Sequence, residues 1–398
     1  MSQIRDYNDR KENSNLIDEL SQNNEDVDEQ IFIDEGKLVA NGPLMIPEGF
    51  KINVFAQNLG KARVLEVDPL GNILVSVIDQ GRIVLLPDEN KDSIADRFVT
   101  IAQGFNSPHG IELNCEVNSS ICQLYIAESD EVSRYDYDPK LQKISNEVKL
   151  FGLPEGGLHF TRTIKILEKD GIPELYTSIG SSCNACIEED WKFATVLKSD
   201  LDGQNLSPYS VGLRNMVFFE GNPLTGEIWG TEMGRDWLGD DLPPDEVNIL
   251  EKGRDYGWPY CYGKNIHDTD FDKNTYNVNV DLGVCKSLGK TGTHIDLQAH
   301  SAPLGLEFVK GDDWDGLYQN HLLIALHGSW NRSEPVGYNV IAIKLDEMGN
   351  ELERFDFISG WLTEDKKVLG RPVDLMINNG KLYISDDKAG VIYLMERE

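Results

Sequence analysis

A pattern of short apolar runs separated by turns recurs along the chain from about Pro47, and it constrains the fold more than any other feature. Within each run apolar and polar residues alternate, and the turns contain Gly, Asn, Asp or Ser. Six copies occur mostly about fifty residues apart, with longer insertions after the fourth. They begin at Val64, His109, Arg162, Asn215, Leu304 and Pro372. This spacing predicts an all-β fold, a six-bladed β-propeller with four-stranded antiparallel blades.

The two ends of this repeating region are predicted to meet. The early run KINVFA (51–56) pairs with the last run, VIYLM (391–395), and closes the ring. Two separate β-sandwiches are the alternative, but they would need a linker in the middle that the sequence lacks. We therefore predict one propeller domain over residues 41–398, in which each blade packs only on its neighbours. Residues 1–40 are mostly polar, have no apolar signal-peptide stretch, and are predicted to be disordered.

The formal charge of -31 and the pI near 4.5 limit the partners. Nucleic acids and anionic membranes are excluded, because both would be repelled where attraction is needed. No apolar run approaches the roughly 20 residues that cross a bilayer, so we expect no membrane span.

The six cysteines fall into three local pairs. An even number in local pairs is typical of disulfides and of an oxidising, extracytoplasmic compartment, either periplasmic or secreted. Buried thiols in a cytoplasmic protein are the alternative, and the absence of a visible signal peptide keeps it open. The pairs are Cys115 with Cys122, Cys183 with Cys186, and Cys261 with Cys285.

Polar residues gather in the turns that come before the first strand of several repeats. In a propeller these turns converge around one mouth of the central channel. His109, Arg162, Arg214 and Arg371 hold equivalent positions in four such turns, which folding alone does not require. Histidine is the usual general base near neutral pH, and arginine binds carboxylates, quinone oxygens or phosphates with paired donors. The set predicts a site for a polyanionic cofactor or substrate.

An acidic stretch between Gly230 and Gly263 is the second candidate feature. It places six acidic residues within fifteen positions, with glycines and prolines between them: Glu232, Asp236, Asp240, Asp241, Asp245 and Glu246. Carboxylates and exposed backbone carbonyls are the ligands that Ca²⁺ prefers. A solvated acidic loop is the alternative interpretation.

Other chemistries lack their signatures. There is no phosphate-binding glycine loop between a strand and a helix, and no GxSxG motif. The single CxxC, at Cys183 and Cys186, has neither a second pair nor a thioredoxin-like context, so zinc and dithiol chemistry are disfavoured.

Several motifs occur in the order found in a known family. They are SPHGIEL, GGLHFTRTIKI, SIGSSCNACIEED, GLRNMVFF, GRDWLGDDLPPDEVNIL, YGWPYCYG, LHGSWNRSEPVGY, and GRPVDLMI with YISDDKAGVIYLM. Over residues 45–396 the chain resembles the glucose/sorbosone dehydrogenase family, the soluble quinoprotein sugar dehydrogenases, and is most similar to the sorbosone/aldose branch. The resemblance implies a six-bladed propeller that oxidises a sugar hydroxyl to a lactone while hydride moves to pyrroloquinoline quinone (PQQ). It leaves the sugar and the electron acceptor open.

The resemblance also implies site residues. His109 matches the catalytic base. Arg214 matches the residue that stabilises charge on the quinone oxygen, and Asn215 its neighbour on the quinone. Arg371 matches an arginine that holds a PQQ carboxylate.

The implied Ca²⁺ bridges the protein and PQQ. Its ligands in the family are two successive backbone carbonyls, which align with Gly234 and Arg235. The loop is longer in this chain, so other ligands are implied to come from Asp240, Asp241 or Asp245.

Three positions leave a choice or depart from the family. An acidic residue near PQQ matches either Asp386 or Asp387. The family's lysine on PQQ has no clear match, and Asn331 or Arg332 stands in its place. The glutamine near the substrate is absent, and Arg63 occupies the nearest turn.

Two other functions remain as alternatives. A Ca²⁺-dependent propeller lactonase would need several carboxylates and asparagines at the channel axis, without arginines on three turns. A non-catalytic propeller that binds protein or glycan would leave His109 and Arg214 unexplained.

Overall fold

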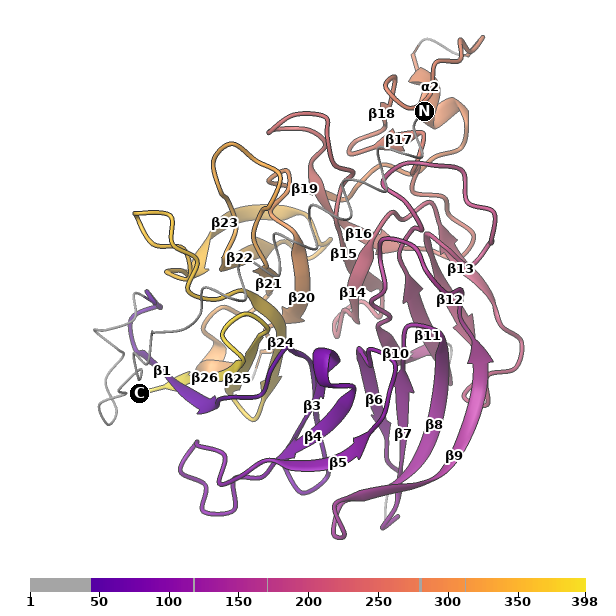
Figure 1. Cartoon of the computed structure of the whole chain (residues 1–398). Coiled ribbons are helices and arrows are strands. Elements are labelled where there is room, and N and C mark those ends of the chain that lie inside the picture. Colours follow the sequence, from indigo (N-terminus) through magenta and orange to yellow (C-terminus); the bar gives the residue numbers. More distant parts are fainter. Residues whose placement is uncertain (1–43, 117–118, 170, 279–280, 312) are drawn as a thin grey trace, which may run out of the picture. The chain divides into compact units, whose positions relative to one another are not determined.

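The structure, a computed structural model, describes residues 44–398 apart from 117–118, 170, 279–280 and 312. The described chain forms six four-stranded antiparallel sheets arranged as the blades of a propeller (Figure 1). The predicted fold class is confirmed. The predicted polar segment, residues 1–40, lies outside the described residues.

The first three blades follow the chain without interruption. Blade one contains β2 (Ala62–Val67), β3 (Ile73–Val77), β4 (Arg82–Leu86) and β5 (Val99–Gln103), with a 3-10 turn at Ile78–Gln80. Blade two contains β6 (Gly110–Asn114), β7 (Cys122–Ala127), β8 (Glu131–Asp138) and β9 (Lys143–Gly152). Blade three contains β10 (Ile164–Lys169), β11 (Ile172–Ile179), β12 (Thr195–Ser199) and β13 (Ser207–Val211).

The fourth blade holds the predicted long insertion. It contains β14 (Met216–Gly221), β15 (Ile228–Glu232), β16 (Asp245–Leu250) and β19 (Ile295–Leu297). Between its last two strands lie a small hairpin, β17 (Cys261–Tyr262) with β18 (Ile266–His267), and the helix α2 (Gly283–Ser287).

The last two blades bring the chain back to its start. Blade five contains β20 (Pro303–Phe308), β21 (His321–Leu326), β22 (Asn339–Leu345) and β23 (Glu351–Ile358), with a 3-10 turn at Asp313–Gly316. Blade six contains β24 (Pro372–Asn378), β25 (Lys381–Asp386), β26 (Val391–Arg397) and β1 (Phe50–Ala56). β1 pairs antiparallel with β26, with Phe50 opposite Arg397. The predicted ring closure is therefore confirmed.

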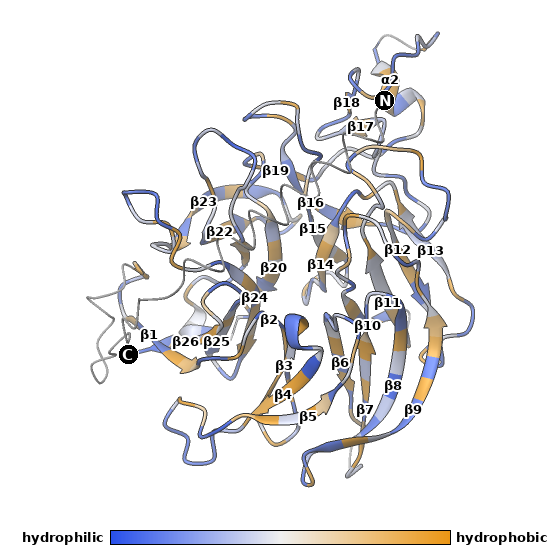
Figure 2. Cartoon of the chain, viewed as in Figure 1, coloured by the Kyte–Doolittle hydropathy of each residue, from blue (hydrophilic) through white to orange (hydrophobic). Residues whose placement is uncertain are grey.

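The first strand of each blade lines the middle of the propeller. β2, β6, β10, β14, β20 and β24 each contact the first strands of both neighbouring blades. The strands carry most of the apolar residues, and the connecting loops are mainly hydrophilic (Figure 2). All five residues of β3 are buried, whereas the outer strand β9 is largely exposed. This gradient reflects blades that pack face to face and are most exposed to water at their outer strands.

Irregular pairing at the start of the inner strands shapes the mouth of the channel. The register shifts within the first residues of β2, β14, β20 and β24. Such bulges bend a strand and re-aim its side chains. At β6 a glycine has a related effect: a Cβ on Gly110 would lie 2.6 Å from the Arg162 carbonyl oxygen, so only glycine allows this approach to the next blade.

The structure also forms all three predicted disulfides: Cys115–Cys122, Cys183–Cys186 and Cys261–Cys285. Among the described residues, none of the helices has the length and apolar character needed to span a bilayer.

Candidate active site at the channel mouth

His109 stands immediately before β6 and is completely buried. Its Nε2 lies 3.4 Å from an Nη of Arg63, and its Nδ1 lies 3.2 Å from the Thr163 hydroxyl. Arginine can only donate, so Nε2 must be the acceptor and Nδ1 must carry the proton that it donates to Thr163. Burial, followed by the positive charge of Arg63, lowers the pKa of His109 well below its usual range. His109 is therefore a neutral imidazole with its basic nitrogen facing Arg63.

Arg63 begins a chain of polar contacts that crosses from blade one to blades five and six. It donates to Asp387 Oδ2 at 2.7 Å, and Asp387 Oδ1 accepts from His327 Nε2 at 2.9 Å. His327 Nδ1 in turn accepts from Arg371 at 3.3 Å. The Arg371 guanidinium also lies 5.1 Å from the Tyr338 ring centroid. The chain thus links two of the arginines through a carboxylate and a histidine.

The two adjacent aspartates after β25 differ in their contacts. Asp386 is fully buried, and its Oδ1 accepts backbone N–H groups of Arg371, Lys388 and Ala389. Burial raises the pKa of Asp386 to about 6. Burial also opposes ionisation of Asp387, but the charges and hydrogen bonds of His327 and Arg63 outweigh it and lower the pKa of Asp387 below its usual range. Asp386 builds the turn, whereas Asp387 is the ionised partner of the arginine chain.

Arg214 comes before β14 and is almost completely buried. Its Nη1 donates to the Gly234 carbonyl at 2.8 Å, and its Nη2 donates to Asp236 at 2.9 Å. Its Nε and Nη2 also donate to the carbonyl and side-chain oxygens of Asn184, at 3.0 and 2.9 Å. Burial lowers the pKa of Arg214, against the opposing charge of Asp236. Arg214 is a fixed positive charge whose orientation is set from two loops.

The glycine at position 234 sits at a close approach between two parts of the acidic stretch. A Cβ there would lie 2.8 Å from both Pro243 Cγ and the Pro244 carbonyl oxygen. Its N–H donates to Asp245 Oδ1 at 2.9 Å, and the other oxygen of Asp245 accepts from Ala302 N–H and the Ser301 hydroxyl. Burial raises the pKa of Asp245 to about 6. The side chain of Asp245 thus ties Gly234 of the acidic stretch to residues 301–302.

The remaining residues of the acidic stretch take separate partners. Asp240 binds the backbone and hydroxyl of Ser333. The side chain of Asp241 is 91% exposed and pairs with Arg332 at 3.2 Å. Arg332 also donates to the carbonyls of Asp240 and Ala299. The structure therefore does not bring the side chains of Asp240, Asp241 and Asp245 together.

Asn331 is linked to Arg214 through a shared partner. Its Nδ2 donates to Asp236 Oδ1 at 2.9 Å, so Asp236 bridges Asn331 and Arg214. The side chain of Arg235 points to Asp268 in the insertion, at 2.8 Å. In this segment, Arg214 is contacted by the Gly234 carbonyl and the Asp236 carboxylate.

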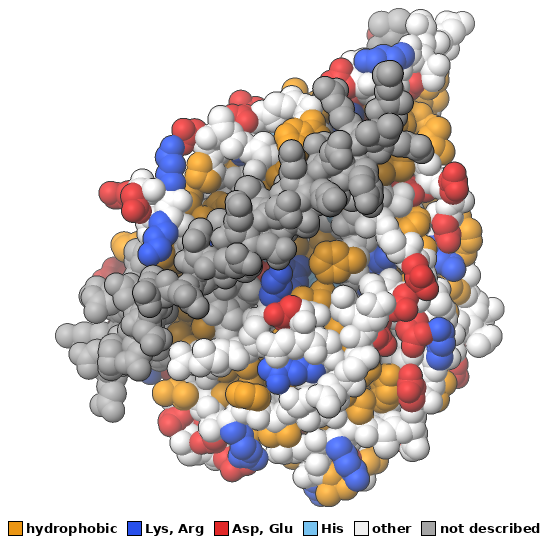
Figure 3. Space-filling model, in the orientation of Figure 1, with side chains coloured by type: hydrophobic (Ala, Val, Ile, Leu, Met, Phe, Trp, Pro, Cys, Tyr) orange, Lys and Arg blue, Asp and Glu red, His pale blue; other side chains and the backbone are white. Residues whose placement is uncertain are grey.

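Several buried polar atoms around this mouth have no hydrogen-bond partner within the described part of the chain. They include Nε of Arg63 and Oδ1 of Asn215. Buried polar atoms are nearly always paired, so unpaired ones indicate a ligand or water that completes the site. Together with the arginine donors, they fit a polar, anionic cofactor. In the space-filling view, basic side chains and an acidic one lie near the middle of the visible face, and most other charges lie around its margin (Figure 3).

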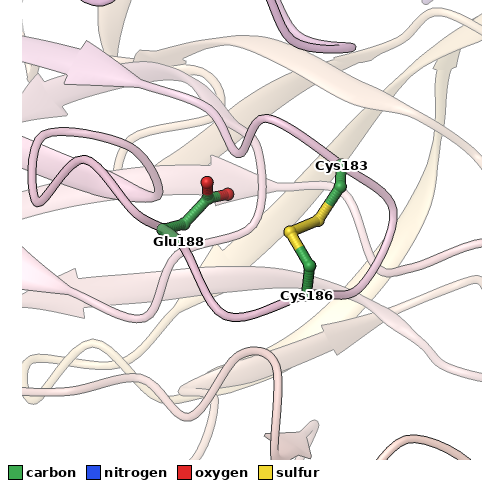
Figure 4. Close-up of side chains that lie close together, drawn as sticks. All are labelled: Cys183, Cys186 and Glu188. Atoms are coloured by element: carbon green, nitrogen blue, oxygen red, sulfur yellow. A yellow bond between two sulfur atoms is a disulfide. The ribbon is translucent and has the colours of Figure 1, made fainter.

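A second cluster of potential metal ligands lies in the loop after β11. Cys183, Cys186 and Glu188 come close together (Figure 4), but the two sulfurs are bonded to each other. Glu188 accepts from the N–H and hydroxyl of Ser182. Because neither cysteine offers a thiolate, this cluster is a disulfide loop and not a metal site.

Sequence reasoning missed some of this network. The sequence places Arg162 among the mouth arginines, yet its donors go to the carbonyls of Pro154, His159 and Thr161. The sequence does not mark Asn184, except by its place between two cysteines.

The fold and the site define a propeller protein with a buried histidine and a network of arginines at the mouth of its channel. The chain belongs to the TrAA12-like family, whose profile matches residues 44–398. It is 32% identical over 363 residues to a Borreliella burgdorferi protein named only as uncharacterized, covering 88% of this chain and 90% of that one. It is 25% identical over 337 residues to the PQQ-dependent pyranose dehydrogenase of Coprinopsis cinerea, covering 75% of this chain but only 44% of that protein. The resemblance found in the motifs is thus confirmed.

Solved structures share the fold. The PQQ domain of the Coprinopsis cinerea pyranose dehydrogenase, in its holo form, superposes with a TM-score of 0.73 at 21% identity, over 90% of this chain and 98% of that one. A calcium structure of the Trichoderma reesei family AA12 protein also gives 0.73, at 20% identity, covering 91% and 99%. The PQQ-bound aldose sugar dehydrogenase of Streptomyces coelicolor gives 0.62, at 19% identity, covering 89% and 100%.

Proposed function

We propose that this protein is a PQQ-dependent oxidoreductase that oxidises the hydroxyl of an aldose-type sugar to the lactone, with His109 as the general base. The observation that carries this proposal is the geometry of His109: a neutral imidazole whose proton is held on Nδ1 by Thr163 and whose unprotonated Nε2 accepts only a long, 3.4 Å contact from Arg63. The printed names of the Coprinopsis and Streptomyces proteins support the cofactor and the substrate class.

PQQ accepts a hydride when it is bound. Arg371 and Arg63 supply donors for its carboxylates and oxygens, with Asp387 and His327 fixing how the two guanidinium groups point. Arg214 places a buried positive charge beside the position where negative charge would develop, and Asn215 offers an unpaired oxygen. His109 Nε2 takes the hydroxyl proton from the sugar. Asn331 and Arg332 act indirectly, because they hold the loop of the acidic stretch through Asp236 and the Asp240 carbonyl.

For Ca²⁺ we propose the backbone carbonyls of Gly234 and Arg235. The calcium structure of the Trichoderma protein supports a role for this ion. In this chain the Gly234 carbonyl accepts from Arg214, so the ion and the guanidinium would share that oxygen. Asp240, Asp241 and Asp245 would then shape the loop that presents the carbonyls, each through the contacts described above.

We also propose an extracytoplasmic location, because three disulfides persist in an oxidising compartment and rarely in the cytosol.

The test is reconstitution of the purified protein with PQQ and Ca²⁺, followed by an aldose panel with an artificial electron acceptor. We expect turnover and a changed PQQ absorption spectrum. His109→Gln should lose at least about 100-fold in kcat while still binding PQQ. Thr163→Val, which removes the acceptor for the Nδ1 proton, should lower kcat by a smaller factor. If the wild-type protein shows neither turnover nor a spectral change, the proposal is wrong.

A further inference from the structure

Asn184, which the sequence analysis does not identify, contacts both Arg214 and Asp236 at the mouth. Its carbonyl oxygen accepts from Arg214 Nε at 3.0 Å and from Trp258 Nε1 at 3.2 Å. Its side-chain oxygen accepts from Arg214 Nη2 at 2.9 Å and from the Asp236 N–H at 2.8 Å. Its Nδ2 donates to the Asp236 carbonyl at 3.1 Å. One residue thus binds both the arginine and the backbone of the acidic stretch.

The residue is held in a small covalent ring. Asn184 lies between Cys183 and Cys186, whose disulfide closes the loop (Figure 4). The loop is tied further by the Ser181 hydroxyl, which donates to the Cys183 carbonyl at 2.6 Å, and by Glu188, which accepts twice from Ser182. A loop constrained in this way loses little freedom when its polar atoms bind Arg214.

This disulfide differs from the other two in its surroundings. Cys261 and Cys285 are both buried, and in the third disulfide Cys122 is buried in a hydrophobic cluster while Cys115 is exposed. Cys183 and Cys186 are both half-buried. The contacts made within the ring are instead polar and directed at Arg214 and Asp236.

We propose that Asn184, held by the Cys183–Cys186 disulfide, is a positioning residue that fixes Arg214 and the 234–236 backbone in the orientation the cofactor needs. The need for a cofactor rests on the function proposed above; the fixing of Arg214 does not. The side chain of Asn184 makes three of these hydrogen bonds and its carbonyl accepts two. Removing the amide should abolish the first set, and opening the ring should loosen the second.

The first test uses the protein without cofactor. Phenylglyoxal modifies accessible arginines, and mass spectrometry of the peptides gives the rate at Arg214, with Arg371 as the internal reference. We expect Asn184→Ala and the double variant Cys183→Ser/Cys186→Ser each to raise the rate at Arg214 about tenfold. The first variant loses the side-chain hydrogen bond to the guanidinium, and the second loosens the loop that holds both the side chain and the carbonyl. Asn184→Asp keeps an oxygen acceptor and should stay close to wild type.

The matched control is Cys115→Ser/Cys122→Ser, which opens a disulfide at the far end of β6, away from His109. It should leave the rate at Arg214 unchanged. Unchanged rates in both Asn184→Ala and the Cys183 and Cys186 double variant, or an equal rise in the control, would overturn the proposal. If the Cys183 and Cys186 double variant does not fold, as judged by its melting curve, Asn184→Ala alone decides.

The second test titrates PQQ into each protein in the presence of Ca²⁺. We expect Kd to rise about tenfold in Asn184→Ala, with kcat at saturating PQQ changed less. A wild-type Kd in this variant would also overturn the proposal. If the wild-type protein binds no PQQ, the proposed function fails, while the phenylglyoxal rates still decide whether Asn184 positions Arg214.

Discussion

At the scale of single residues, Arg63 controls the chemistry available to His109. Its guanidinium lies 3.4 Å from His109 Nε2. Burial is the larger cause of the lowered pKa of His109, and the positive charge of Arg63 lowers it further. A base with a lowered pKa stays unprotonated in mild acid, so activity should persist well below pH 6.5, the ordinary range of histidine.

Replacing Arg63 should change the pH at which His109 becomes protonated and activity is lost. In Arg63→Gln the positive charge is gone, so the pKa of His109 rises and protonation removes the base at a higher pH. We expect the acid limb of kcat/KM to shift upward by about one pH unit. Arg97→Gln, a change at an exposed arginine paired with Glu89, should leave the profile unchanged. An acid limb at the same pH in Arg63→Gln and wild type would contradict the assignment of His109 as the titrating base.

The residue scale is also where the sequence predicted least. The positions of His109, Arg214 and Arg371 in turns before inner strands follow from the repeat. Which atoms they contact does not, because the repeat does not encode the partners: Arg63 of blade one contacts Asp387 of blade six, whereas Arg162 binds carbonyls of its own loop. Asn184 could not be found, since its importance comes from a fold that brings residues 184 and 214 together.

At the scale of elements, the inner strands place ionisable side chains along the channel. Five of the six contribute a carboxylate and β10 contributes Lys165, which lies 2.8 Å from Glu220. Burial raises the pKa of Glu66 to about 7, and of Glu112 and Glu307 to about 8. The folded state therefore holds protons that the unfolded chain has lost. Stability from these groups is complete below about pH 4.5 and is lost as the pH rises toward 8.

Glu307→Gln tests this dependence. The amide cannot ionise, so the variant should be more stable than wild type at pH 8.5 by a few degrees in melting temperature, and nearly equal to it at pH 5. Glu353→Gln, an exposed position on β23 in the same blade, is the control and should show no such difference. A gain of equal size at both pH values would mean that the effect comes from packing and not from charge.

The repeat itself explains why the elements were predictable. Each blade is built from short alternating strands whose pattern survives in the sequence, because every inner strand meets the same surroundings in the ring. The insertion between β16 and β19 escaped prediction in detail, since its hairpin and α2 have no counterpart in other blades.

At the scale of the whole molecule, the ring depends on β1 and β26 meeting across the full length of the chain. β1 contributes the buried side chains of Phe50, Ile52 and Phe55. Each such side chain stabilises the fold by roughly 1.5–3 kcal/mol, so losing β1 should cost several kcal/mol and leave β26 with a bare edge.

Two truncations separate the strand from the polar segment before it. A chain that starts at residue 41 should melt like the full-length protein, which also tests the predicted domain boundary. A chain that starts at residue 58 lacks β1 and should melt at a clearly lower temperature and aggregate. Equal melting temperatures for the two truncated chains would show that ring closure does not stabilise the propeller.

The pairing of β1 with β26 has a consequence for how the protein is made. At about 5–20 residues per second, translation leaves β1 waiting tens of seconds for its partner strand to emerge. Arg371 and Asp387 belong to the same late blade, so the mouth is completed only after the ribosome has released nearly the whole chain. Under the proposed function, cofactor loading would therefore follow synthesis, because a prematurely terminated chain would lack Arg371 and Asp387.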